Sequence, residues 1–331
     1  MTNNQEPPSG LPTSLEGRAF GKAILLGEHA VVMGAPALVA GLPGCMRARD
    51  TGSCERLSVT VKPWGLRAVA NLDESIPSRA LGALDDTLAS AGLSAEDRAR
   101  NVLVEASIPS RAGLGSSAAL AVSVGRLLAL LANRHDLQSP ARAAELAKGS
   151  ETVFHGKPSG VDAAAAAYGG IGAFARSLGF SRVEHDKTLH LVVASSGSRP
   201  PSHEMVERIY SLSRSDRCAR AHLSRLGDLA ANGAFLLTRG RLADLGEAMN
   251  EAHDLLSRLG ASTEALDRLV MECRKGGALG AKLTGAGGGG CIVGLCTKET
   301  LPSLLLRLEG QTAWLADFAI EPSVKDRNGN P

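Results

Sequence analysis

The hydrophobic positions of the chain come in short runs that glycine and polar residues interrupt, a pattern typical of strands mixed with helices. Runs at residues 23–26 and 30–33 flank a polar group of three residues and predict two strands joined by a turn. Residues 57–61 and 65–69 alternate in polarity and predict a β-hairpin. The first part of the chain is therefore expected to begin with a β-sheet.

Longer stretches with leucine and alanine at helical spacing predict helices, and further apolar runs predict strands. The predicted helices cover residues 78–93, 116–133, 139–149, 163–167, 201–214, 217–238, 241–259, 263–275 and 301–308. The other predicted strands cover residues 102–108, 189–194, 281–284, 290–295 and 314–321. The succession of helices and strands after residue 185 predicts a second α+β unit.

The composition is that of a globular protein large enough for two domains, with 331 residues of which 44% are hydrophobic and 21% charged. The 36 basic and 34 acidic residues nearly cancel and form no basic run, so nucleic acid is not an expected partner. The polar first 14 residues, with three prolines, predict a flexible tail rather than a signal peptide. No apolar stretch reaches the roughly 18 residues that cross a bilayer. We expect a cytoplasmic protein that does not bind membranes.

Six cysteines are present, and none forms a CxxC pair, so the sequence predicts neither a disulfide framework nor a zinc site. Cys291 and Cys296 are expected to be buried as small hydrophobic residues. The chemistry must then come from other side chains.

Residues 109–119 read PSRAGLGSSAA and place a glycine turn between a predicted strand and a long helix. Glycines let successive backbone N–H groups point into one concavity, and a helix start adds unpaired donors. That geometry suits a phosphate, and the two serines could supply hydroxyls to a phosphate and to Mg²⁺. A tight turn with serine caps is the alternative. The spacing differs from the Walker pattern, and no lysine follows the second glycine.

Residues 151–162 read ETVFHGKPSGVD, with a carboxylate at each end and Gly and Pro between them. Turns can bring Glu151 and Asp162 into one pocket, where phosphoryl transfer to an alcohol needs one carboxylate for Mg²⁺ and one for the attacking hydroxyl. The alternative is a solvent loop in which Asp162 caps the next helix.

Two further segments combine glycine with polar residues. Residues 285–290 contain five glycines in six positions directly before an apolar strand, which favours an ordered loop at a ligand over a flexible linker. Lys22, Glu28 and His29 flank the predicted strand at residues 23–26. Considered singly, these three residues would more often be surface charges and a hydrogen-bonded histidine.

Together, the four segments resemble the motif set of the GHMP small-molecule kinases, in the same order along the chain. Within that family, residues 21–32 (GKAILLGEHAVV) and 151–162 resemble the mevalonate kinase branch, as do residues 250–262 and 280–291. Ala163, Met33 and Ser202 depart from residues common in that branch, which bears on substrate contacts rather than on the reacting groups.

The resemblance implies a role for each matched residue. Asp162 would accept the proton of the substrate hydroxyl, Lys22 would stabilise the developing charge, and Ser117 and Glu151 would hold Mg²⁺. The implied ATP-binding residues are Pro109, Arg111, Ala112, Gly113, Leu114, Gly115, Ser116, Ser117 and Ala118. The implied acceptor-binding residues are Glu28, His29, Asp162, Gly285, Ala286 and Gly287.

The resemblance also implies an α+β fold of two domains, the first like a ribosomal small-subunit protein and the second ferredoxin-like. We expect a flexible tail at 1–16, an ATP-binding domain at 17–184 and a C-terminal domain at 185–325. The sequence leaves open whether the protein forms a homodimer.

The implied reaction is ATP-dependent phosphorylation of the primary 5-hydroxyl of mevalonate. One alternative is a phosphomevalonate kinase, for which Lys157 and Arg199 offer positive groups, and another GHMP small-molecule kinase is a second. A third is a non-catalytic ligand-sensing relative, against which the intact Lys22, Glu151 and Asp162 argue.

Overall fold

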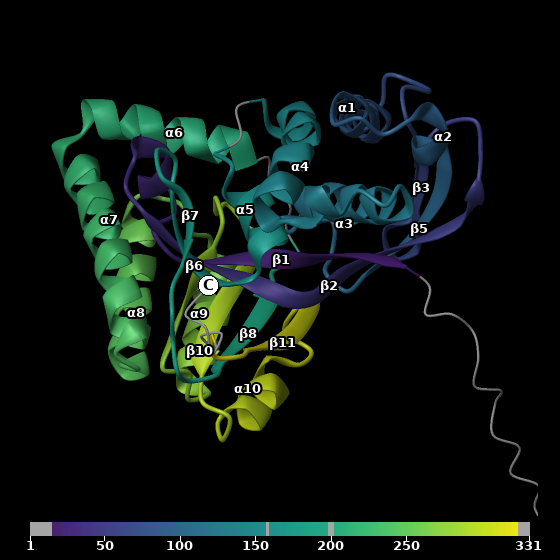
Figure 1. Ribbon diagram of the computed structural model, residues 1–331. Coiled ribbons are helices and arrows are strands. Elements are labelled where there is room, and N and C mark those ends of the chain that lie inside the picture. The colour runs from purple at the N-terminus through teal and green to yellow at the C-terminus, as the bar shows by residue number, and fades with distance from the viewer. Residues whose placement is uncertain (1–14, 157–158, 198–201, 324–331) are drawn as a thin grey trace, which may run out of the picture.

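The fold consists of two β-sheets whose outer sides carry helices (Figure 1). The computed structural model describes residues 15–156, 159–197 and 202–323. Most of the predicted tail therefore lies outside the described residues. In the described part of the chain, no helix combines the length and apolar character that a membrane crossing requires.

Groups of strands and groups of helices follow one another along the chain, as the sequence predicts. The strands are β1 (Glu16–Leu26), β2 (Ala37–Ser53), β3 (Ser58–Val61), β4 (Leu66–Val69), β5 (Arg100–Ala106), β6 (Gly170–Ala175), β7 (Gly179–Arg182), β8 (Leu189–Ser195), β9 (Gly280–Thr284), β10 (Cys291–Cys296) and β11 (Trp314–Ile320). The α-helices are α1 (Ile76–Ser90), α2 (Ala95–Arg98), α3 (Ser116–Leu131), α4 (Pro140–His155), α5 (Val161–Tyr168), α6 (Ser202–Ser215), α7 (Arg217–Thr238), α8 (Leu242–Arg258), α9 (Glu264–Lys275) and α10 (Leu301–Leu308). The mixed α+β class is confirmed.

The first sheet has the strand order β4-β3-β5-β2-β6-β7, with β1 paired to β2. The long strand β2 pairs with β1, β5 and β6, all antiparallel, so it is the centre of this sheet. Helices α1, α3, α4 and α5 lie together over one face of this sheet (Figure 1). A core of leucine, valine and alanine fills the space between them.

The second sheet is antiparallel, with the order β11-β8-β10-β9, and it packs against α8, α9 and α10. Strand β11 contacts β2, and α7 contacts both β1 and β2. One continuous hydrophobic core therefore joins the two sheets.

Most predicted elements are confirmed, including the hairpin β3–β4, the strand before the glycine turn and the long helices of the second half. The strand predicted at residues 30–33 is wrong. Gly27 and His29 adopt positive φ angles of 98° and 59°, which turn the chain away from β1. Ala30–Met33 then forms a 3₁₀ turn, with the N–H of Val32 donating to the carbonyl of His29 over 3.1 Å. Strands β2, β6 and β7 are additional to the prediction.

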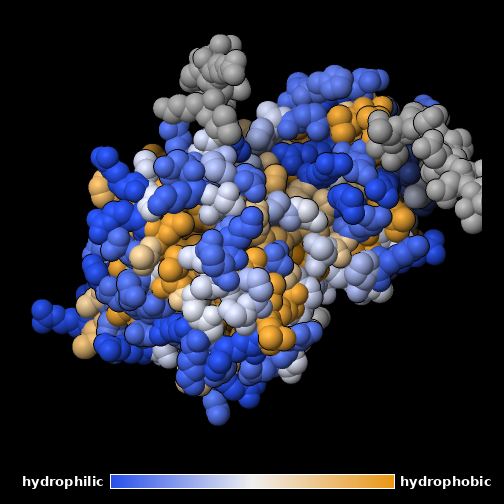
Figure 2. Space-filling model, turned by 90° about the horizontal axis from the view of Figure 1, so that it is seen from below, coloured by the Kyte–Doolittle hydropathy of each residue, from blue (hydrophilic) through white to orange (hydrophobic). Residues whose placement is uncertain are grey.

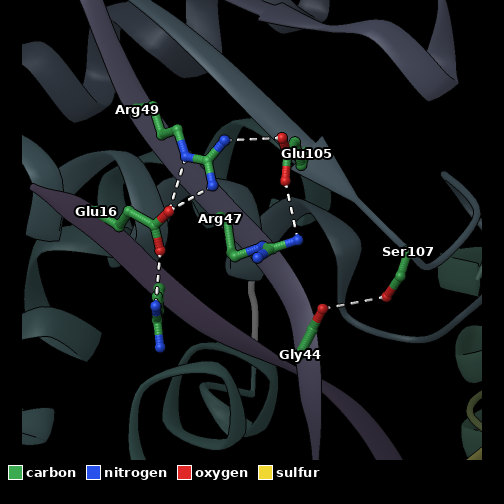
Figure 3. Close-up of polar contacts among 7 residues, drawn as sticks. Glu16, Gly44, Arg47, Arg49, Glu105 and Ser107 are labelled. Atoms are coloured by element: carbon green, nitrogen blue, oxygen red, sulfur yellow. Dashed lines mark hydrogen bonds and ion pairs between the residues drawn. The ribbon is translucent and has the colours of Figure 1, made fainter. Parts of the chain in front are cut away.

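Surface ion pairs link strands β1, β2 and β5 (Figure 3). Arg49 of β2 binds Glu16 of β1 with Nε to Oε1 at 2.7 Å, and its Nη1 binds Glu105 of β5 over 3.1 Å. Arg47 adds a contact to Glu105 at 3.0 Å. Ion pairs at the protein surface contribute little to stability, so the register depends mainly on the apolar face beneath them.

Candidate active site

The glycine turn between β5 and α3 has the backbone of an anion-binding loop. Gly113 and Gly115 adopt positive φ angles of 80° and 69°, and Arg111 joins them at 59°. The N–H of Arg111 donates to Oγ of Ser116 over 3.3 Å, which fixes the turn. Gly115 is the N-cap of α3 and supplies no side-chain cap. The N–H groups of the first helical turn are therefore oriented for an anionic ligand.

Lys22 and Asp162 meet beside this turn. Lys22 lies in β1, and its Nζ contacts Oδ1 of Asp162 over 3.0 Å. The backbone N–H of Lys22 donates to the carbonyl of Leu114 over 2.9 Å, so β1 and the glycine turn are joined directly. The Lys22 side chain is 6% exposed and that of Asp162 is 23% exposed, so the carboxylate is the partner that a ligand can reach. Asp162 lies in the first turn of α5, whose N-cap is Gly160, so its role as the cap is excluded.

Glu151 and Ser117 form the other side of the same pocket. Ser117 of α3 donates its hydroxyl proton to Oε1 of Glu151 in α4 over 3.1 Å. Burial, and then the nearby charge of Asp162, raise the pKa of Glu151 to about 8. The proton that this carboxyl holds near neutral pH is the one that a bound cation would replace.

The donor set suits Mg²⁺ because it consists of hard oxygen atoms with negative charge nearby. In the described ranges, no cluster of three or more His, Cys, Asp or Glu side chains could hold a metal by itself. Mg²⁺ in phosphoryl transfer uses one or two protein ligands together with water and substrate phosphates, which is the number available here.

The second glycine loop, residues 285–290, lies against the first. A Cβ at Gly285 would lie 3.5 Å from the carbonyl oxygen of Gly113, and one at Gly290 would lie 3.2 Å from that of Ala112. Both glycines have positive φ angles, 92° and 83°. Side chains here would crowd the glycine turn and strain the loop, so the close approach explains the glycines.

His29 connects the polar turn after β1 to this second loop. Its Nε2 lies 2.9 Å from the carbonyl oxygen of Ala286, and because a carbonyl only accepts, Nε2 carries the proton. Burial lowers the pKa of His29 to about 4, so the ring is neutral near pH 7. Nδ1 is then the acceptor nitrogen of the ring.

Lys282 is a site residue that the sequence reasoning missed. Its Nζ forms an ion pair with Oε1 of Glu28 and also donates to the carbonyl of Leu283 over 2.5 Å. The side chains of Lys282 and Glu28 are 0% and 1% exposed. The available signal was a single lysine inside the apolar run at 281–284, because a charge in a buried strand requires a partner.

Strand β9, which carries Lys282, is an edge strand whose backbone is paired by side chains. The N–H of Ala281 donates to Oδ1 of Asn250 over 3.0 Å, and that of Leu283 to Nδ1 of His253 over 3.3 Å. Nη2 of Arg274 donates to the carbonyl of Ala281 over 3.1 Å. The segment at 250–262 thus holds the strand that reaches the site.

Thr284, at the end of β9, joins the strand to the first sheet. Its hydroxyl accepts from the N–H of Ile24 over 2.8 Å and lies 3.2 Å from the Ile24 carbonyl. The site is therefore assembled from both halves of the chain.

The remaining residues of the predicted ATP site differ in how exposed their side chains are. Arg111 is exposed and Pro109 is half-buried, whereas Ala112, Leu114 and Ala118 are buried in the core. These three can offer a nucleotide only backbone atoms. Lys157, Arg199 and the side chain of Ser202 lie outside the described residues.

Two family models match the chain. The GHMP kinases N terminal domain matches residues 76–170, and the GHMP kinases C terminal model matches residues 234–311. The mevalonate kinase of Aeropyrum pernix is 35% identical over 285 residues, which covers 84% of this chain and 87% of that protein. The mevalonate kinase of Pyrococcus horikoshii is 33% identical over 296 residues, 83% of this chain and 86% of that one.

Solved structures share the fold over nearly the full length. The crystal structure of L. major mevalonate kinase in complex with R-mevalonate superposes with a TM-score of 0.82 at 26% identity. The match covers 94% of this chain and 97% of that chain. The two-domain fold expected from the sequence is thereby confirmed.

Proposed function

The chain belongs to the GHMP kinase family, and on that premise we propose that it transfers the γ-phosphate of ATP to the primary 5-hydroxyl of mevalonate. The products are 5-phosphomevalonate and ADP. The acceptor is inferred from the mevalonate kinases among the relatives and from the R-mevalonate bound in the L. major structure. The observation that carries the proposal is the contact of Lys22 with Asp162 at 3.0 Å beside the glycine turn.

In this mechanism Asp162 accepts the proton of the attacking hydroxyl while it holds the oxygen in line with the γ-phosphate. Lys22, fixed against Asp162, stabilises the negative charge of the alkoxide and of the moving phosphoryl group. The backbone N–H groups at the start of α3 bind the nucleotide phosphates. Little covalent chemistry is required of the protein, because positioning and charge neutralisation dominate phosphoryl transfer.

We propose that Ser117 and Glu151 hold Mg²⁺. The ion supplies charge neutralisation for the phosphates when it is bound. Glu28, neutral His29 and the loop at 285–287 border the acceptor pocket, and the contact of His29 with Ala286 supports this placement.

The boundary between an ATP-binding domain at 17–184 and a C-terminal domain at 185–325 remains part of the proposal. It is supported by the strands, because the first sheet ends with β7 at Arg182 and the second begins with β8 at Leu189. Phosphomevalonate kinase activity stays the alternative. The positive groups that would favour it, Lys157 and Arg199, lie outside the described residues.

Asp162→Asn tests the proposal. The amide keeps the shape of the side chain but cannot accept the proton, so kcat should fall by about 10²- to 10⁴-fold while ATP affinity stays nearly unchanged. The matched control is Asp136→Asn, the same chemical change at an exposed aspartate that pairs with Arg134. It should retain wild-type turnover. Full activity in Asp162→Asn would refute the role of this carboxylate.

A further inference from the structure

The ionisable groups between the two sheets form a chain of interactions. Burial, and then the charge of Asp162, raise the pKa of Glu151, and Lys22 contacts Asp162 over 3.0 Å. Burial raises the pKa of Glu28, the charge of Lys282 and then that of Lys22 oppose this rise, and Glu28 is paired with Lys282. The order is therefore Glu151, Asp162, Lys22, Glu28, Lys282. The proposed mechanism uses the first four and leaves Lys282 without a role.

The charge of Lys22 lies near two carboxylates, those of Asp162 and Glu28. Among the described residues, Lys22 forms an ion pair with Asp162 alone. Glu28 binds Lys282 through Oε1, and its other oxygen, Oε2, is buried without a hydrogen-bond partner in the described part of the chain. A buried carboxylate that loses its cation recruits another cation or a proton. The nearby cation that could be recruited is Lys22.

We propose that Lys282 is a positioning residue for phosphoryl transfer, because by engaging Glu28 it leaves Lys22 to Asp162. The inference rests on the proposed function of Lys22 and Asp162. Lys282 lies in β9 and Glu28 follows β1, so the pair also spans the two sheets. The second half of the chain thus controls the position of a reacting group in the first half.

The experiment compares Lys282→Met with the double variant Lys282→Met/Glu28→Gln, using kcat at saturating substrates and circular dichroism for the fold. In Lys282→Met the unpaired Glu28 should draw Lys22 away from Asp162 and lower kcat at least ~10-fold, as loss of a positioned charge does. Adding Glu28→Gln removes the competing charge, so kcat should recover at least ~5-fold. In the double variant the KM for the acceptor should remain above the wild-type value, because Glu28 borders the acceptor pocket.

A matched control separates positioning from stability. Arg274→Met removes a different cation that holds the same strand through the carbonyl of Ala281. It should lower the melting temperature and leave kcat within about twofold of wild type, since Arg274 does not neutralise Glu28.

A kcat for Lys282→Met within about threefold of wild type would overturn the proposal, as would a double variant no faster than Lys282→Met. If Lys282→Met does not fold, the double variant decides. If the double variant loses less than about tenfold in kcat relative to the wild-type protein, the proposal is supported. A larger loss overturns it. All ratios are measured with whichever acceptor the wild-type protein turns over, so failure on mevalonate tests the proposed function separately.

Discussion

Two buried histidines make stability depend on pH at the scale of single residues. Burial lowers the pKa of both His29 and His253 to about 4, from 6.5 for an exposed imidazole. Between pH 6.5 and 4 the unfolded chain binds protons that the folded protein does not. The free energy of unfolding should therefore fall as the pH falls through this window.

His253→Asn isolates one of these two contributions. The asparagine Oδ1 takes the position of Nδ1, which accepts from the N–H of Leu283, but the side chain no longer titrates. The melting temperature of the wild-type protein should fall more steeply between pH 7 and 5 than that of the variant, as measured by scanning calorimetry. Parallel curves for the two proteins would show that His253 does not remain neutral in the fold.

The residues with the most specific chemistry are those that sequence reasoning identified. Lys22, Ser117, Glu151 and Asp162 are brought together as their motifs imply. Lys282 was missed because its partner, Glu28, lies 254 positions away in the sequence. The local spacing of residues does not indicate a pair at that distance. The lysine inside an apolar run indicated a buried charge, but only the folded chain shows that its partner is Glu28.

At the scale of elements, the glycine turn should be sensitive to any side chain at Gly115. A Cβ there would lie 3.2 Å from Cβ of Lys22, and φ is 69°. Gly115→Ala should therefore cost ~1 kcal/mol of stability from the left-handed backbone and lower kcat by at least ~10-fold by displacing Lys22.

Gly44→Ala is the control for this change. Its φ of 71° is nearly identical, and a Cβ there would meet nothing within 4 Å. The two variants should lose similar stability in urea unfolding, whereas kcat should fall only in Gly115→Ala. Equal kcat values for both would show that strain at Gly115 does not reach the site.

Helices were predicted more completely than strands, because an amphipathic helix carries its pattern in its own residues. Helices α7 and α9 were predicted within one residue of their bounds. Strand β2 has no such pattern. Residues 37–42 are all buried, because their side chains enter hydrophobic cores on both faces of the strand, and the alternation begins only after Pro43 and Gly44. The 3₁₀ turn at Ala30–Met33 was mistaken for a strand because a short apolar run fits both.

At the scale of the whole molecule, the six cysteines report on the integrity of the fold. Burial raises the pKa of Cys45 to about 11 and those of Cys273, Cys291 and Cys296 to about 12. Cys218 is exposed and Cys54 is half-buried. Two thiols should therefore react rapidly with a disulfide reagent at pH 8 in the native protein, and all six after unfolding. Rapid reaction of more than two would contradict the packing of both sheets.

The surface on the side of α10 mixes polar and apolar residues. Figure 2 shows small orange groups separated by blue ones on this face. Such a surface does not by itself indicate an interface. The mass in solution tests whether the protein forms a homodimer.

The central claim concerns the acceptor, and one measurement tests it most directly. Purified protein is assayed with MgATP and, in parallel, mevalonate, phosphomevalonate, galactose and homoserine, and kcat/KM is compared. Mevalonate should give the highest value, and the product should carry its phosphate on the 5-oxygen. A higher kcat/KM with any of the other three acceptors would contradict it.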